Sequence, residues 1–85
     1  MIKLSRHQTA TSTVIGIDGR LDAQTVPELR TLLAACGQPP PEIDLSGLRS
    51  LDADGLRVLS SLQKSGHALT GASIYIRTML REANP

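Results

Sequence analysis

The sequence contains very few aromatic residues. Its 85 residues include one tyrosine and no phenylalanine or tryptophan, so it offers no platform on which the bases of single-stranded nucleic acid would stack. A core must therefore come from 22 leucine, isoleucine and valine residues, each contributing roughly 1.5–3 kcal/mol when fully buried. A chain of this length has room for one such core, and we expect a single domain over residues 1–85.

Strong net charge, paired cysteines and long apolar runs are also absent. Nine basic and eight acidic residues give a net charge of +1 without a basic stripe, so nucleic acid is not an expected ligand. The single Cys36 excludes an internal disulfide. No segment resembles a signal peptide or reaches membrane-spanning length. These absences predict a cytoplasmic protein that does not insert into a membrane.

The first half of the chain predicts a hairpin followed by a helix. Residues 1–8 and 13–19 alternate apolar and polar side chains, with a polar break between them. Apolar residues then recur at helical spacing. Thr25 and Glu28 match a capping box at the start of this helix, and Gly37 is placed to end it. The apolar stripe comprises Val26, Leu29, Leu32, Leu33 and Cys36.

The second half alternates strands and helices. After the proline-rich connector at 38–41, we expect a strand over 42–48, a helix from about Asp54 to Gly66, a short strand over 67–72 and a helix over 73–83. The resulting order is β-β-α-β-α-β-α, with about four strands and three helices. Right-handed crossovers then imply a small α/β domain with a mixed, mainly parallel sheet.

The segment "DADG" at residues 52–55 lies between the third strand and the second helix. Sites in α/β sheets tend to lie at such carboxyl ends of strands. The spacing of these residues does not match a calcium-binding EF-hand loop. If Gly55 is aligned with the sixth position of the loop, Ser61 falls at the twelfth, where a bidentate carboxylate is needed. His7 and His67 lie on different elements, so we expect no metal site.

A D-x-D-G after an apolar strand also resembles the haloacid-dehalogenase phosphatases. That resemblance would make Asp52 the nucleophile and Asp54 the acid/base, with both helping to hold magnesium. The further acidic pair that this chemistry requires is missing, because Glu82 is the only carboxylate side chain after Gly55. Phosphatase activity is therefore a remote alternative.

Another resemblance extends over residues 13–82. The motifs G-R-L-D at 19–22 and D-x-x-G-L at 52–56 stand in an order and at a separation that resemble the STAS family of sulfate-transporter and anti-sigma-factor-antagonist domains. The resemblance implies a STAS-like fold and a protein-binding module. It implies no catalytic residues and no cofactor.

Bacterial anti-sigma-factor antagonists of this family carry D-S-S-G or D-S-T-G at this position. A partner kinase of the histidine-kinase-like ATPase type phosphorylates the first serine, and the unphosphorylated protein binds that kinase, which is itself the anti-sigma factor. The added charge then switches binding off. In this sequence Ala53 occupies the position of that serine and Asp54 follows it. The resemblance thus implies an antagonist-like protein that is not phosphorylated at Ala53.

The partner-binding surface implied by the resemblance centres on the start of the second helix. The acidic residues at this helix start also have a structural explanation. Aspartates cap helices, and their negative charge is stabilised by the positive end of the helix dipole. The two roles are compatible, since a capped helix end can also lie in an interface. The partner-binding residues that we predict are Asp22, Asp52, Ala53, Asp54, Gly55 and Arg57.

Two other kinds of partner are compatible with the sequence. One alternative is a STAS accessory subunit of an ABC transporter of the phospholipid-trafficking type, which docks on an ATPase and needs no phosphorylatable serine. The other is a second copy of the chain. Many STAS domains continue beyond the third helix, so a missing sheet edge and a small core favour a homodimer.

Overall fold

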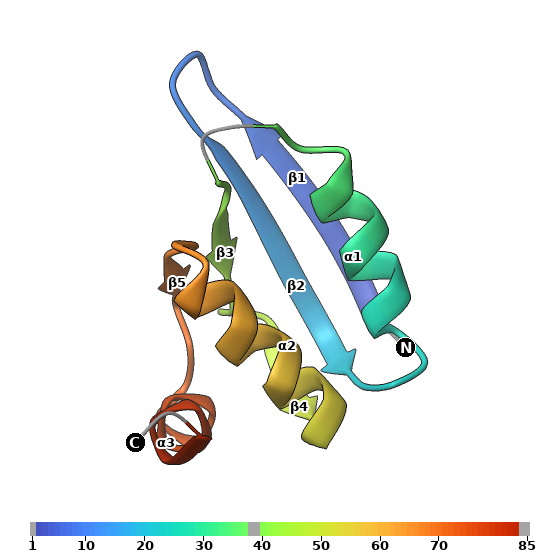
Figure 1. Ribbon diagram of the computed structural model, residues 1–85, viewed down its shortest axis with the longest axis vertical. Coiled ribbons are helices and arrows are strands. Elements are labelled where there is room, and N and C mark those ends of the chain that lie inside the picture. The colour runs from blue at the N-terminus through green and yellow to red at the C-terminus, as the bar shows by residue number, and fades with distance from the viewer. Residues whose placement is uncertain (1, 38–39, 84–85) are drawn as a thin grey trace.

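The computed structural model describes residues 2–37 and 40–83, so the connector residues 38 and 39 lie outside it. The expected α/β class is confirmed (Figure 1). No helix in these two ranges is long and apolar enough to cross a membrane. In chain order, the elements are β1 (Ile2–Gln8), β2 (Thr13–Leu21), α1 (Val26–Ala34), β3 (Glu42–Asp44), β4 (Leu48–Leu51), α2 (Ala53–Lys64), β5 (Leu69–Thr70) and α3 (Ile74–Ala83).

The sheet is mixed and mainly parallel, as predicted. β1 and β2 form the antiparallel hairpin. β3 and β4 both run parallel to β2, with Ile43 opposite Ile15 and Leu51 opposite Leu21. β5 runs parallel to β3, where Leu69 pairs with Ile43, and forms an edge of the sheet.

The strand expected over 42–48 is divided into β3 and β4, which gives five strands instead of about four. Asp44 Oδ1 accepts a hydrogen bond from the Ser46 N–H at 3.0 Å, and the Leu48 N–H donates to the Leu45 carbonyl at 3.0 Å. A polar turn of this kind interrupts the strand. It shifts the chain along β2, so that β4 ends beside Leu21 and α2 begins there.

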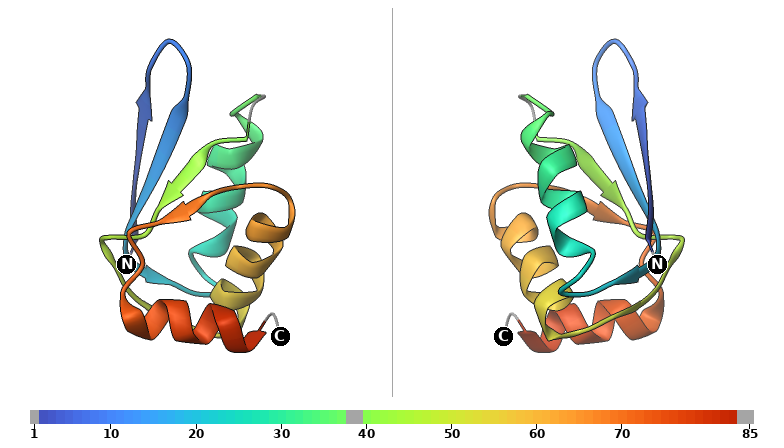
Figure 2. Two further views of the ribbon diagram at one scale, coloured as in Figure 1. Left: turned by 90° about the vertical axis from the view of Figure 1, so that its left-hand side faces the viewer. Right: turned by 90° about the vertical axis from the view of Figure 1, so that its right-hand side faces the viewer.

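Aliphatic side chains from the sheet and all three helices form one core. α1 and α2 lie on the same face of the sheet, whereas α3 lies across one end of the domain and packs against α2 (Figure 2). No aromatic side chain contributes to this core. The buried members are Ile15, Ile17, Leu21, Val26, Leu29, Ile43, Leu45, Leu48, Leu51, Val58, Leu59, Ile76 and Leu80.

Gly66 stops α2, as predicted, two residues after its last helical residue, Lys64. Gly66 has a φ of 100°, and its N–H donates to the Gln63 carbonyl at 3.2 Å. The His67 N–H donates to the Leu62 carbonyl at 3.0 Å, and the two bonds together form a Schellman motif. The corresponding prediction for Gly37 is wrong, because α1 already ends at Ala34 and Gly37 does not have the positive φ of Gly66.

The predicted capping box of α1 is also wrong. Thr25 occupies the N-cap position, but its side chain makes no hydrogen bond to the helix. Its hydroxyl accepts from the Asp22 N–H at 2.9 Å and donates to the Arg20 carbonyl at 3.1 Å. The buried Thr25 thus holds the end of β2 to the start of α1, and Glu28 has no reciprocal role.

Candidate functional site

Asp52 caps α2 and links it to the loop between β2 and α1. Its Oδ1 accepts from the Gly55 N–H at 2.9 Å, and its Oδ2 accepts from the Ala23 N–H at 3.2 Å. The Asp52 N–H donates to the Leu21 carbonyl at 3.2 Å. The predicted helix cap is confirmed. The contact with Ala23 was not foreseen, and it sets the positions of both helix starts.

The pKa of Asp52 lies below its ordinary value of 3.8. The largest cause is the hydrogen bond from the Gly55 N–H; the N–H groups of Ala23 and Asp54 and the charge of Arg20 act in the same direction, while desolvation opposes them. Asp52 is therefore ionised at neutral pH, where its charge favours the helix start. Its carboxylate caps the helix, and the residues that the structure describes hold no group of three or more His, Cys, Asp or Glu side chains that could bind the magnesium of the phosphatase alternative.

Gly55, predicted as a partner-binding residue, is buried and has a packing role. A Cβ at this position would overlap the carbonyl oxygen of Leu21 and lie 3.0 Å from its carbonyl carbon. Only a glycine lets the first turn of α2 approach the end of β2 this closely. Gly55 therefore allows the start of α2 to pack against β2, and it does not lie at the surface where a partner would bind.

Ala53 is exposed at the first position of α2. Beside it, Asp54 Oδ1 accepts from Arg57 Nη1 at 2.8 Å in an ion pair whose two side chains are 48% and 75% exposed. Such an exposed pair contributes little to stability. It does place a positive charge against Asp54, so the surface around Ala53 does not carry the uncompensated charge of a phosphorylated serine.

Asp22, predicted as a partner-binding residue, serves as a turn residue before α1. Its Oδ1 accepts from the N–H groups of Gln24 and Thr25, each at 3.0 Å. Its Oδ2 lies 3.3 Å from Arg20 Nε. The sequence analysis gave Thr25 a capping box and missed its hydrogen bonds to Asp22 and Arg20, although aspartate and threonine side chains often bond to nearby backbone groups in turns.

These contacts bring the starts of α1 and α2 together at one end of the sheet (Figure 1). We call the exposed and half-exposed residues here the α1–α2 surface: Ala23, Pro27, Ala53, Asp54 and Arg57. A groove of about 290 Å³ between the two helices is lined by four of these residues, Ala23, Pro27, Asp54 and Arg57. A second groove of about 560 Å³ runs from Ala53 along α2 to the end of α3. Shallow grooves beside an exposed helix start suit contact with another protein.

Comparison with known proteins gives one family match. A family model described as "Mlab, STAS domain" matches residues 4–84. Among solved structures, the chain is similar to an uncharacterized protein of the DUF3478 family with a SpoIIAA-like fold from Shewanella loihica. The identity is 22% and the TM-score 0.49, over 98% of this chain and 77% of that one. No curated protein sequence matches the chain.

Proposed function

The chain belongs to the STAS domain family, and from that premise we propose that it is a protein-binding module that docks on its partner through the α1–α2 surface. The observation that carries the proposal is the exposed Ala53 at the first position of α2. Antagonists of the family are switched at this position by phosphorylation of a serine. Alanine keeps the position small and uncharged, so phosphorylation at this position does not switch docking off.

The partner we favour is an anti-sigma factor of the histidine-kinase-like ATPase type. A phosphate at the start of α2 would carry a charge of about −1.5 to −2 and would need desolvation in the interface. Ala53 has no hydroxyl to receive it, so the kinase activity of such a partner does not release this chain. The protein then acts as an antagonist whose binding is controlled by its amount or by competition.

An ABC transporter ATPase is the second candidate. Ala53 favours it, since an accessory subunit of that kind docks without a phosphorylatable serine. The family model that matches the chain is also described by the name Mlab and not by that of an anti-sigma factor. Both candidates use the same surface, so they differ in the partner and not in the mode of binding.

Co-purification from the native cell decides between the two partners. Tagged wild-type protein and an Ala53→Arg variant are compared, with captured proteins identified by mass spectrometry and then purified for direct binding. A histidine-kinase-like ATPase that binds the wild type and not the variant supports the first candidate. An ABC ATPase with the same behaviour supports the second. An ATPase that binds both forms equally contradicts docking through the α1–α2 surface.

A further inference from the structure

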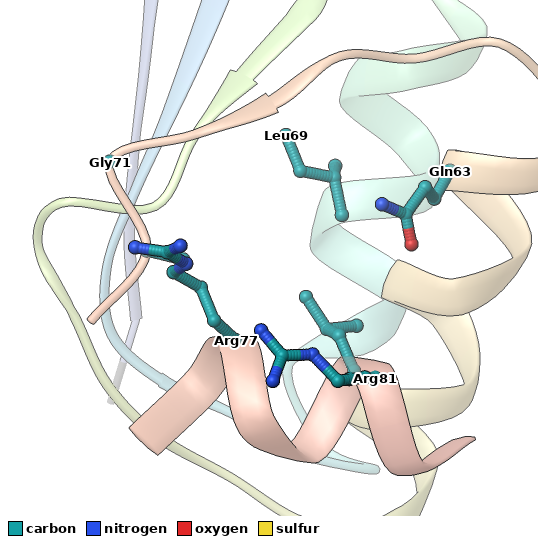
Figure 3. Close-up of a pocket in the computed structure, with 7 residues that line it drawn as sticks. Gln63, Leu69, Gly71, Arg77 and Arg81 are labelled. Carbon is teal, nitrogen blue, oxygen red and sulfur yellow. The ribbon is translucent and has the colours of Figure 1, made fainter. Parts of the chain in front are cut away.

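A separate cavity of about 600 Å³ lies where the end of α2, β5 and α3 meet (Figure 3). Gln63, Leu69, Arg77 and Arg81 line it from these three elements, and the Arg77 side chain extends toward the Gly71 turn (Figure 3). Gln63 is ten residues beyond Ala53 on α2, which corresponds to about 15 Å along the helix. The cavity is therefore distinct from the α1–α2 surface.

Arg77 and Arg81 give this cavity a concentrated positive charge. They stand four residues apart on α3, so their side chains occupy the same face of the helix. Within residues 2–37 and 40–83, neither guanidinium has a side-chain hydrogen bond or an ion pair, and Glu82 pairs with neither. Like charges one turn apart repel each other. An anion between them would remove that repulsion.

The turn before α3 gives the cavity its shape. Gly71 directly follows β5, has a φ of 72°, and passes so close to β3 that a Cβ would lie 2.8 Å from Asp44 Oδ1. That Asp44 oxygen accepts the N–H of Ser46. The cavity thus opens at the carboxyl ends of two parallel strands, which is a common location for ligand sites in α/β sheets.

Apolar and neutral polar groups complete the lining. Leu69 is half-buried and Leu80 is 6% exposed, so the cavity has an apolar wall beside its two cations. The Gln63 side chain supplies both an amide donor and an acceptor. A volume of about 600 Å³ lies within the range of small-molecule sites, roughly 300–1,000 Å³, so it accommodates more than an inorganic anion.

We propose that Arg77 and Arg81 bind the phosphate of a phosphate monoester, with the organic part of the ligand against Leu69 and Leu80. Guanidinium groups match phosphate oxygens in paired hydrogen bonds. Two of them balance the charge of about −1.5 to −2 that a monoester carries at neutral pH. The phosphate comes from a soluble metabolite or from a lipid headgroup, and the recognition chemistry is the same in both cases.

Titration followed by NMR tests this site. Labelled protein is titrated with inorganic phosphate, glycerol 3-phosphate, short-chain phosphatidic acid below its micelle concentration, and neutral glycerol as a control. We expect saturable shifts at the Arg77 and Arg81 side-chain Nε–H groups and the Gly71 amide with the phosphate compounds, and none with glycerol. Tighter binding of phosphatidic acid identifies a lipid headgroup, whereas equal or tighter binding of glycerol 3-phosphate identifies a soluble ligand.

Charge-neutralising variants complete the test. Because both arginines are exposed, the double variant Arg77→Gln, Arg81→Gln keeps its fold, and we expect it to weaken binding by about tenfold or more. Arg30→Gln removes an exposed arginine from α1 and leaves the affinity unchanged. The proposal is overturned if no phosphate compound binds saturably, or if the double variant binds as tightly as the wild type.

Discussion

The Asp52 carboxylate accepts a hydrogen bond from the backbone N–H of Ala23, 29 residues earlier in the chain, at 3.2 Å. Its other oxygen caps α2 through the Gly55 N–H. One side chain thus fixes the start of α2 against the loop that precedes α1. The α1–α2 surface depends on this contact, because its residues come from both sides of it.

Asp52→Asn is expected to lower the melting temperature at neutral pH. Asparagine keeps one acceptor oxygen, but its NH₂ group cannot accept the second backbone hydrogen bond. An Asp18→Asn variant, which changes an exposed carboxylate on β2, is the matched control and leaves the melting temperature close to that of the wild type. Thermal unfolding followed by circular dichroism measures both, and equal melting temperatures for wild type and Asp52→Asn would contradict the bridging role.

The effect of Asp52 on stability should depend on pH. Its pKa in the folded protein lies below the ordinary 3.8, chiefly because the Gly55 N–H donates to it. The folded state therefore binds fewer protons than the unfolded state, so the stabilisation is complete above the unfolded pKa and disappears as the pH falls through the folded pKa. Urea titrations from neutral to acid pH should show the difference between wild type and Asp52→Asn closing below pH 3.8. A difference that widens in acid refutes this assignment.

Gly55→Ala is expected to destabilise the protein by about 1–3 kcal/mol, because the added methyl overlaps the Leu21 carbonyl. This loss outweighs the gain of up to about 1 kcal/mol that alanine brings to a helix. Gly37→Ala is the control, since nothing lies within 4 Å of a Cβ there, and its stability stays within about 0.5 kcal/mol of the wild type. Urea unfolding measures both, and a neutral Gly55→Ala would disprove the close approach.

The hydroxyl of Thr25 should contribute much more to the stability of the fold than the carboxylate of Glu28. Thr25→Val removes a buried hydroxyl that bonds to Asp22 and Arg20, and should cost about 1–3 kcal/mol. Glu28→Ala, which cannot make the reciprocal bond of a capping box, should change stability by less than about 0.5 kcal/mol, because no capping box exists. Chemical denaturation measures both variants, and a Glu28→Ala variant as destabilised as Thr25→Val would show that the capping box is present.

Phosphorylation should be restored by a single substitution if the partner is a serine kinase. Wild-type protein incubated with that kinase and ATP should gain no phosphate on residues 52–55, whereas Ala53→Ser should gain one at the exposed first position of α2. Intact-mass and peptide mass spectrometry read out both. A phosphate on the wild-type 52–55 segment would contradict the absence of the switch.

Features encoded by neighbouring residues were predictable from the sequence. The Asp52 cap and the Gly66 stop depend on residues within a few positions of each other, and the local pattern contains them. The mainly parallel α/β sheet followed from the alternation of strands and helices. The family resemblance rested on short motifs in the correct order, and the family match over residues 4–84 confirms it.

Features that depend on distant segments were not predictable. The local pattern gave Thr25 a partner in Glu28, but its hydroxyl bonds back to the end of β2. The burial of Gly55 depends on Leu21, which lies in a strand far from it in sequence. The division of the third strand, by contrast, was missed although its cause is local: Asp44 accepts the Ser46 N–H, and aspartate, serine and glycine, which stand at 44, 46 and 47, are common turn residues.

The affinity of the purified protein for its ATPase partner tests the central claim most directly. Isothermal titration compares the wild type with Ala53→Arg and with Ala34→Arg, which adds the same side chain to an exposed alanine at the opposite end of α1. We predict that Ala53→Arg weakens binding by at least about tenfold, as expected for a bulky charge inside an interface, while Ala34→Arg binds like the wild type. Wild-type affinity for Ala53→Arg would contradict docking through the α1–α2 surface.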